Sequence, residues 1–325
     1  MNQFILRKKL NVKAFEKYIA FAQENNQFSN YGVAVKTLES RARDMLKIDD
    51  SKAIIATSSG SSALNCILNA ICRKNEKSLR IASQVFTFPS NTQGAAAGPI
   101  YLDFNQNLDI DLENEFINFA DIIIVTNCFG HLQNIDYILE NIGEKLLIFD
   151  NAATPYSFWK GTNSCNIGTA SYVSLHHTKP IGFGEGGLAI IDKEYEETAR
   201  AAVNFGILQN EPINSYGGNY KMSELSAAGI LQWWDSFDID ELSNQYLDNY
   251  FDMRYQFASE KGDIFPHRAE EDEIFFPNCF PFIHMESTQK DDNEYHRKYY
   301  KPIASMGVAD QVYDKIMCYG LVNNE

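Results

Sequence analysis

Short strand-like and helix-like segments alternate along the first half of the chain, and this alternation limits the possible folds more than any other feature. Apolar runs take turns with segments in which apolar residues recur at helical spacing. Beginning with a strand, the alternating segments are 79–83, 89–97, 100–104, 112–119, 122–126, 135–142 and 146–150. This rhythm predicts an α/β fold with a mainly parallel central sheet and helices on both faces.

The flanking segments extend the same pattern. Further helices are expected within 13–46 and at 63–73, and further strands at 53–57, 170–175 and 188–191. Each of these strands is short and apolar, as buried strands of parallel sheets are. All of these elements therefore fit one large α/β unit.

The last portion of the chain has a different character. Residues 240–325 read as α+β, with a strand expected at 280–285 and a helix at 292–305. A chain of 325 residues is long enough for one large and one smaller domain. We therefore expect a large domain over residues 1–240 and a smaller α+β domain over residues 241–325.

Charge and cysteine usage exclude several classes of protein. The formal net charge of −15 argues against nucleic acid as a main partner, because a phosphate backbone requires a basic face. The six cysteines form no CxxC pair and do not cluster with histidines, so we expect free thiols in a reducing cytosol and no metal site. No signal peptide is recognisable and no stretch is apolar enough to span a bilayer, so we expect a cytoplasmic protein without a membrane partner.

One lysine stands within a glycine-rich stretch after the strand expected at 170–175. Residues 174–187 read SLHHTKPIGFGEGG, and Lys179 lies between two histidines and four glycines. Glycines allow close backbone approach, and a lysine enclosed in this way is a candidate for a lowered pKa and for imine chemistry. The alternative is a surface lysine in a glycine-rich turn, and this stretch alone does not separate the two.

Small residues link the strand expected at 53–57 to the next helix. The run Ser58 to Ser62 precedes the helix start, where free N–H groups and the helix dipole create an anion site. A plain serine N-cap is the alternative. Five small residues in a row exceed what a cap requires, so the sequence favours a phosphate near Gly60 and Ser61.

Two more residues of interest lie at or near strand ends. Asp150 ends the apolar run 146–149, and Phe88 follows the strand expected at 79–83. Ligands of parallel sheets bind beyond the carboxyl ends of the strands. Asp150 could simply cap a loop, but it is also placed to share one pocket with Lys179.

A further stretch, residues 216–228, reads YGGNYKMSELSAA. Taken with the Lys179 loop and the GSSAL turn at 60–64, it resembles the DegT/StrS family of nucleotide-sugar aminotransferases that depend on pyridoxal 5′-phosphate (PLP). The signatures of that family include Ser-Phe-His-x-x-Lys…Gly-Glu-Gly-Gly, Gly-Thr-Ala-Ala-Leu and Asn-Tyr-Arg-Met-Ser-Glu-Leu. The resemblance covers about residues 29–235, and more weakly 299–302, with all motifs in the same order.

The resemblance implies a PLP fold type I protein and assigns a role to each of these residues. Lys179 would form the imine with PLP and move the proton, and Asp150 would pair with the ring nitrogen. Phe88 would stack on the cofactor ring. The phosphate would be held by Gly60, Ser61, Ser174 and, from a second subunit, Asn219. The family pattern therefore implies a homodimer with shared active sites.

Four departures from the family pattern stand out. Ala153 occupies the place of the usual Gln or His that contacts the cofactor's phenolic oxygen. Asn127 stands where many members have a histidine, and it could serve this oxygen from nearby. Lys221 replaces an arginine, so a bidentate grip on a carboxylate is lost. The C-terminal part is short for the family.

The function predicted on this basis is transfer of an amino group, from glutamate, to a keto-deoxysugar linked to a nucleotide. One alternative is a PLP-dependent sugar dehydratase. Relatives with that activity have lost the lysine, whereas Lys179 is present here. The other alternative is a non-catalytic binding or regulatory protein of the same fold, which the missing Gln, the change at Lys221 and the short C-terminal part keep open.

Overall fold

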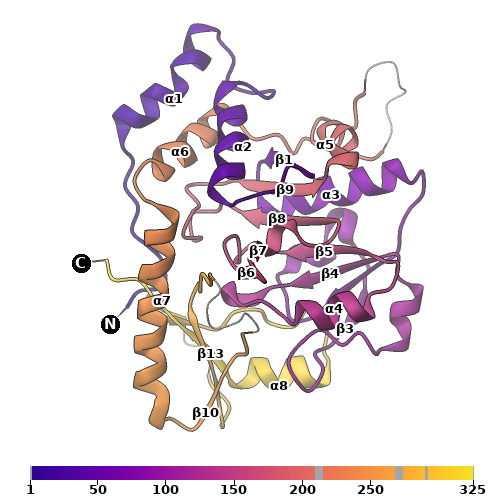
Figure 1. Cartoon of the computed structure of the whole chain (residues 1–325), viewed down its shortest axis with the longest axis vertical. Coiled ribbons are helices and arrows are strands. Elements are labelled where there is room, and N and C mark those ends of the chain that lie inside the picture. The colour runs from indigo at the N-terminus through magenta and orange to yellow at the C-terminus, as the bar shows by residue number, and fades with distance from the viewer. Residues whose placement is uncertain (1, 209–214, 268–273, 290–291, 325) are drawn as a thin grey trace.

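A seven-stranded sheet lies at the centre of the computed structural model, which describes residues 2–208, 215–267, 274–289 and 292–324 (Figure 1). The strand order is β1-β9-β8-β5-β4-β2-β3. The strands are β1 (Lys52–Thr57), β2 (Ile81–Gln84), β3 (Ile100–Leu102), β4 (Ile122–Thr126), β5 (Leu146–Asp150), β8 (Ala170–Ser174) and β9 (Gly187–Asp192). Only the pairs made by β9 are antiparallel. The predicted mainly parallel sheet is confirmed.

Helices cover both faces of this sheet, as predicted (Figure 1). Within the described residues the α-helices are α1 (Val12–Glu24), α2 (Val33–Met45), α3 (Gly60–Lys74), α4 (Ile135–Asn141), α5 (Glu196–Ala202), α6 (Glu224–Trp234), α7 (Ile239–Gln256) and α8 (Gly307–Lys315). In β4, Ile122 and Ile124 pack with α3 and α5, whereas Ile123 and Val125 pack with α4 on the opposite face. This alternation along a strand explains why both faces are apolar.

A second sheet forms the C-terminal part of the molecule. It is four-stranded, entirely antiparallel and ordered β10-β11-β13-β12. Its strands are β10 (Gly262–Ile264), β11 (Phe280–His284), β12 (His296–Arg297) and β13 (Ile316–Tyr319). The α+β character expected there is confirmed, and the boundary at residue 240 stays a prediction. A separate hairpin pairs β6 (Phe158–Trp159) with β7 (Thr162–Asn163).

Three segments expected to be helical are not α-helices. Residues 89–97 form two 3₁₀ turns, because Gln93 is extended between them and Gly94 has a φ of +60°. In 112–119 only Glu115–Phe119 is helical, again as a 3₁₀ turn. Residues 292–305 contain β12 and no α-helix, since Tyr300 adopts a φ of +58° and Pro302 follows it. The helix of this region, α8, begins only at Gly307.

The two ends of the chain lie side by side (Figure 1). Gln3 and Val322 exchange two backbone hydrogen bonds of 2.6 and 2.9 Å.

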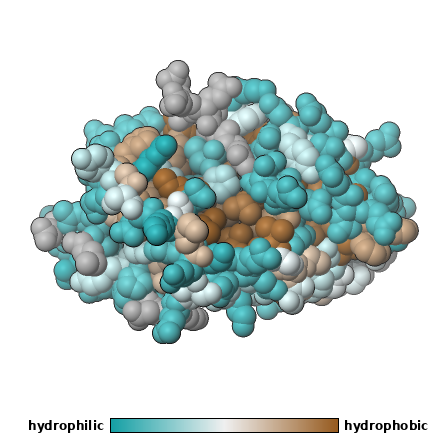
Figure 2. Space-filling model, turned by 90° about the horizontal axis from the view of Figure 1, so that it is seen from below, coloured by the Kyte–Doolittle hydropathy of each residue, from teal (hydrophilic) through white to brown (hydrophobic). Residues whose placement is uncertain are grey.

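All six cysteines are free, as expected. Seen from below, the surface is mostly hydrophilic, with an apolar area near its middle (Figure 2). No helix of the described residues has the length and apolar character that crossing a bilayer requires.

A buried carboxylate joins two distant helices. Glu224, in the first turn of α6, is 1 % exposed. Its carboxylate accepts hydrogen bonds from the N–H groups of Ala34 (2.7 Å) and Val35 (3.4 Å) at the start of α2. Gly32, the N-cap residue of α2, has no side chain to do this. Glu224 therefore caps α2 from a position far away in the sequence.

Replacing Glu224 by alanine is expected to lower the free energy of unfolding by about 2 kcal/mol, because two N–H groups lose their partner in a buried setting. Urea denaturation monitored by circular dichroism measures the change. Glu16→Ala, at an exposed site on α1, is the matched control and should have little effect. Equal stability of the Glu224→Ala and Glu16→Ala proteins would contradict this account of the cap.

Candidate active site

A pocket of about 350 Å³ lies at the carboxyl edge of the central sheet. Strands β1, β5 and β8 all run toward this edge, so the turns that follow them meet there. The lining residues are Ser59, Gly60, Ser61, Phe88, Ser90, Asp150, Ala152, Tyr172, Ser174, His176, Thr178, Lys179, Glu185, Tyr299 and Tyr300. Every candidate residue from the sequence is present except Asn219.

Asp150 is a buried carboxylate at the end of β5, with 2 % of its surface exposed. Its Oδ1 accepts a hydrogen bond of 3.0 Å from the backbone N–H of Ala152. Its Oδ2 lies within 3.4 Å of polar side-chain atoms of Thr87, Asn91 and Thr126. Burial raises the pKa of Asp150, while the Tyr172 hydroxyl, the Ala152 N–H and the Lys179 charge act to lower it.

Tyr172 and Asn91 support this carboxylate, and the sequence analysis missed both. The Tyr172 hydroxyl donates to Asn91 Oδ1 at 2.5 Å, and the Asn91 amide reaches Asp150. Both side chains are buried. Burial, followed by the charge of Asp150, raises the pKa of Tyr172 well above its usual value, so its hydroxyl remains a neutral donor. The position of Tyr172 in the apolar run of β8 is a signal that could have identified it.

Lys179 stands on the loop that joins β8 to β9. Burial lowers the pKa of its amine, and the carboxylate of Asp150 acts in the opposite direction. The loop is tight: Leu175 N–H bonds Gly186 O at 2.9 Å, and His177 N–H bonds Gly184 O at 2.8 Å. A Cβ at position 182 would lie 2.2 Å from the His176 oxygen, so the expected need for close backbone approach is confirmed there.

The first turn of α3 opens onto the same pocket. The helix begins at Gly60, earlier than expected, so Gly60 and Ser61 belong to its first turn. Ser59 is the N-cap residue and accepts a hydrogen bond of 3.1 Å from Ser62 N–H. Part of the serine run therefore caps the helix. A Cβ on Gly60 would lie 3.2 Å from Ser174 Cβ, so glycine lets the first turn approach the end of β8.

Aromatic side chains line other parts of the pocket. Phe88 lines the pocket and is 55 % exposed. Tyr299 and Tyr300 approach from the C-terminal part of the chain. Tyr300 packs against Phe86 and Phe129, with ring centroids 5.7 and 5.0 Å away. The sequence drew attention to these tyrosines only through the weak match at 299–302.

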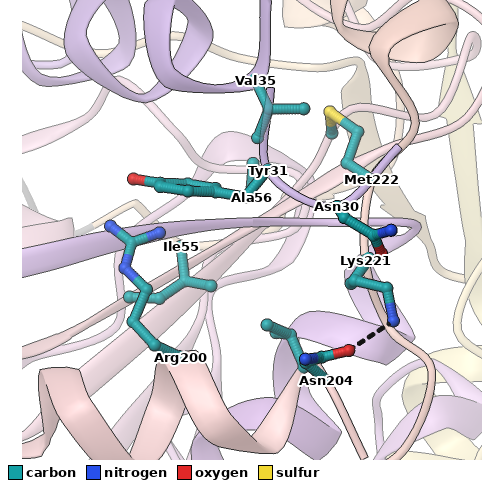
Figure 3. Close-up of a pocket in the computed structure, with 10 residues that line it drawn as sticks. Asn30, Tyr31, Val35, Ile55, Ala56, Arg200, Asn204, Lys221 and Met222 are labelled. Atoms are coloured by element: carbon teal, nitrogen blue, oxygen red, sulfur yellow. Dashed lines mark hydrogen bonds between the residues drawn. The ribbon is translucent and has the colours of Figure 1, made fainter. Parts of the chain in front are cut away.

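Asn219 lies outside this pocket and is exposed. Its neighbour Lys221 lines a second, smaller cavity of about 200 Å³ with Asn30, Tyr31, Val35, Ile55, Ala56, Arg200, Val203, Asn204 and Met222. Figure 3 shows the Lys221 amine bonded to Asn204, at 2.8 Å. The charge of Arg200 is balanced there by Glu39, at 2.8 Å.

The structure also places Ala153 and Asn127. Ala153 is buried and does not line the active-site pocket. Asn127 is buried as well; its amide donates to Asn151 at 2.8 Å, and its oxygen accepts from Gln133 N–H at 3.1 Å. Asn127 is not among the residues that line the pocket, so the suggestion that it serves in place of the usual Gln or His gains no support.

Comparisons with known proteins identify the family of the chain. The model of the DegT/DnrJ/EryC1/StrS aminotransferase family matches residues 10–313. A dTDP-4-amino-4,6-dideoxy-D-glucose transaminase from Shigella dysenteriae is 25 % identical over an alignment of 233 positions, which covers 68 % of this chain and 61 % of that protein. The chain thus matches only about three fifths of this relative's length.

DesI and an AHBA synthase are two of the solved structures that share the fold. DesI, crystallised in the presence of its TDP-sugar product, has a TM-score of 0.77 at 18 % identity, with 98 % of this chain and 88 % of DesI covered. An AHBA (3-amino-5-hydroxybenzoic acid) synthase has a TM-score of 0.80 at 14 % identity, with 98 % and 93 % covered. At these identities the likeness concerns the fold.

The raised pKa of Asp150 predicts that its carboxylate destabilises the protein without cofactor at neutral pH. A group with a raised folded-state pKa contributes stability below its ordinary value of 3.8, and that contribution is lost as the pH rises through the folded-state pKa. Asp150→Asn should therefore raise the melting temperature of the cofactor-free protein at pH 7, by about 2–4 °C for each kcal/mol of penalty removed. The gain should shrink toward pH 4.

Asp121→Asn is the control of opposite sign. The backbone N–H of Arg80 lowers the pKa of Asp121 in the folded state. Its carboxylate therefore stabilises the folded protein above the ordinary pKa of 3.8, and this contribution is lost as the pH falls through the lowered pKa. Scanning calorimetry of both variants over a pH series measures the two effects. A melting temperature that falls at pH 7 in the Asp150→Asn protein would contradict the account of a penalised carboxylate.

Proposed function

The chain belongs to the DegT/DnrJ/EryC1/StrS aminotransferase family, and from this membership we propose that it is a PLP-dependent aminotransferase acting on a nucleotide-linked keto-deoxysugar. Glutamate is the proposed amino donor. The observation that carries the proposal is a single pocket that contains a lysine amine, a buried carboxylate and the first turn of a helix. The amine could react with an aldehyde, the carboxylate could pair with a protonated ring nitrogen, and the first turn of the helix could bind a phosphate.

The pocket residues fit PLP. Gly60 and Ser61 lie in the first turn of α3, where N–H groups without an intrahelical partner bind anions, and Ser174 adds a hydroxyl. The exposed face of Phe88 offers a surface for stacking on an aromatic ring. When bound, PLP supplies an aldehyde that accepts amino groups and a ring that withdraws electrons from the reacting carbon.

Lys179 and Asp150 are the proposed catalytic residues. The lowered pKa of the Lys179 amine favours its neutral form, which can take up a proton from the substrate carbon and return it. The Asp150 carboxylate, ionised in the presence of a cationic partner, would hold a proton on the ring nitrogen. Thr87, Thr126, Asn91 and Tyr172 would keep that carboxylate in one orientation.

Two comparisons support a nucleotide sugar as substrate. The Shigella relative is named a dTDP-4-amino-4,6-dideoxy-D-glucose transaminase, and DesI was crystallised with a TDP-sugar product. The decisive assay incubates the PLP-loaded protein with glutamate and a panel of nucleotide-linked keto sugars, and follows amino-sugar formation by mass spectrometry. A dehydrated sugar without amino transfer would indicate the dehydratase. No reaction with any donor or sugar would indicate a binding protein.

Lys179→Ala should abolish covalent attachment of PLP. Borohydride reduction followed by mass spectrometry should show one PLP adduct in the wild-type protein and none in the variant, and turnover should fall by several orders of magnitude. The fold should persist, because the side chain fills a pocket rather than the core.

Lys193→Ala, at an exposed lysine, is the matched control and should retain the adduct. A reducible adduct that survives in the Lys179→Ala protein would overturn the assignment of this lysine. Far-ultraviolet circular dichroism of both variants separates loss of the lysine from loss of the fold.

We also propose a homodimer with shared active sites. Asn219 is exposed and lies outside its own pocket, as expected if it serves the site of a second copy. The apolar rings of Tyr31 and Phe205 are 38 % and 49 % exposed nearby, and Phe205 lies 4.5 Å from the Lys221 amine. An isologous interface over this region would bring Asn219 of each chain to the phosphate in the other.

Mixing an inactive Lys179→Ala chain with an impaired Asn219→Ala chain tests the shared site. In a dimer of a Lys179→Ala chain and an Asn219→Ala chain, one site carries both lesions and the other carries neither. Such dimers should recover about half of the wild-type activity by symmetry. The assay is run at low PLP, where loss of Asn219 weakens cofactor retention. No recovery beyond the Asn219→Ala parent, or a fully active monomer, would refute the shared site.

A further inference from the structure

Lys8 makes an unusual set of contacts with the loop that carries Lys179. It belongs to the N-terminal arm, defined here as residues 3–8. Its Nζ lies 2.7 Å from the backbone oxygen of His177, and 2.5 Å from the oxygens of both Lys179 and Gly182. All three acceptors belong to one short loop, and one of them is on Lys179 itself.

These three contacts match the chemistry of an ammonium group. A charged lysine has three N–H donors and no acceptor, whereas the neutral amine has only two donors. The ring of Trp233 lies 5.5 Å from Nζ and adds a cation–π contact. Burial opposes the charge and lowers the pKa of Lys8 to about 7, but the three oxygens and the ring favour the ammonium form.

Helix α6 holds the carbonyl groups of the loop that Lys8 does not reach. The indole N–H of Trp233 donates to Pro180 O at 3.0 Å, and that of Trp234 donates to Ile181 O at 2.7 Å. Together with Lys8, the two tryptophans bind the carbonyl groups of four consecutive residues, 179–182. The backbone of the loop is therefore fixed from outside, by side chains that the Lys179 motif does not contain.

The arm also contacts another part of the pocket lining. Phe4 stacks on Tyr299, with ring centroids 5.2 Å apart, and Tyr299 lines the pocket. Gln3 is paired with Val322, and Arg7 N–H donates to Asn324 Oδ1 at 2.7 Å. These hydrogen bonds anchor the arm to the C-terminal end of the chain. The anchored arm stacks Phe4 against Tyr299 and bonds Lys8 to the Lys179 loop.

We propose that Lys8 is a positioning residue for Lys179, and that the N-terminal arm sets the spacing between the Lys179 loop and Tyr299. Lys8 has no contact with the reacting atoms and acts only through the loop backbone. The consequence for catalysis rests on the proposed function, because it assumes that Lys179 carries PLP. The effect of Lys8 on the order of the loop does not depend on the proposed function, and it can be measured in cofactor-free protein.

The test compares amide hydrogen exchange in wild-type, Lys8→Met and Lys9→Met proteins without cofactor. Lys9 is the neighbouring exposed lysine, so its replacement removes a charge but no loop contact. At about pH 6 the ammonium form of Lys8 prevails. We expect the loop amides of His177, Gly182 and Phe183 to exchange at least about tenfold faster in Lys8→Met only, with β4 and β5 unchanged.

A second measurement connects the loop to Lys179. The yield of the borohydride-trapped PLP adduct at limiting PLP should fall several-fold in Lys8→Met and remain normal in Lys9→Met. Lys8→Gln, which keeps two N–H donors, should lie between wild type and Lys8→Met in both measurements. If wild-type protein traps no PLP, the proposed function fails, while hydrogen exchange still decides the role of Lys8 in the loop.

Three outcomes would overturn the proposal. One is loop exchange as slow in Lys8→Met as in wild type. Another is faster exchange in β4 and β5 to the same extent as in the loop, which would make Lys8 a general structural residue. The third is failure of both Lys8→Met and Lys8→Gln to fold. If the loop of Lys8→Met exchanges faster but PLP trapping is normal, only the proposed effect of Lys8 on Lys179 is refuted.

Discussion

The candidate active site depends on keeping the Asp150 carboxylate buried. Burial alone raises its pKa, and the groups that counteract this come from several different segments. Thr126 ends β4, Ala152 follows β5 and Tyr172 lies in β8. Thr126 is opposite Asp150 in the ladder, and Asp150 is opposite Tyr172. A slip of one residue in either pairing would turn these side chains to the other face. The pairing register of β4, β5 and β8 therefore determines which side chains surround the Asp150 carboxylate.

Much of this region could be predicted from the sequence because the determinants are local. The runs 122–126, 146–150 and 170–175 are short and largely apolar, so their strand character is evident. Parallel strands bring their carboxyl ends to one edge, which places Asp150, Lys179 and the Gly60 turn together before any coordinates are known. The polar support of Asp150 was not predicted, because Tyr172 and Asn91 meet only after the sheet has formed.

The C-terminal part was less predictable because its structure depends on contacts between distant residues. Pro302 is a local signal against a helix over 292–305, but no local feature reveals that Tyr300 takes a left-handed backbone conformation. Packing of Tyr300 against Phe86 and Phe129 stabilises that conformation. Similarly, the stacking of Phe4 on Tyr299 joins the N-terminal arm to the C-terminal part of the chain. Periodicity within one segment carries no information about either contact.

The Lys179 loop combines a permissive sequence with external restraint. Its glycines allow the tight path, and Gly184 has a φ of +67°, which other residues rarely adopt. The same glycines give the unfolded loop more conformational freedom, so ordering it costs more free energy. Hydrogen bonds from Trp233, Trp234 and Lys8 to the loop carbonyls offset that cost. A glycine-rich motif can therefore identify a candidate lysine, but the order of its backbone is determined by side chains elsewhere in the chain.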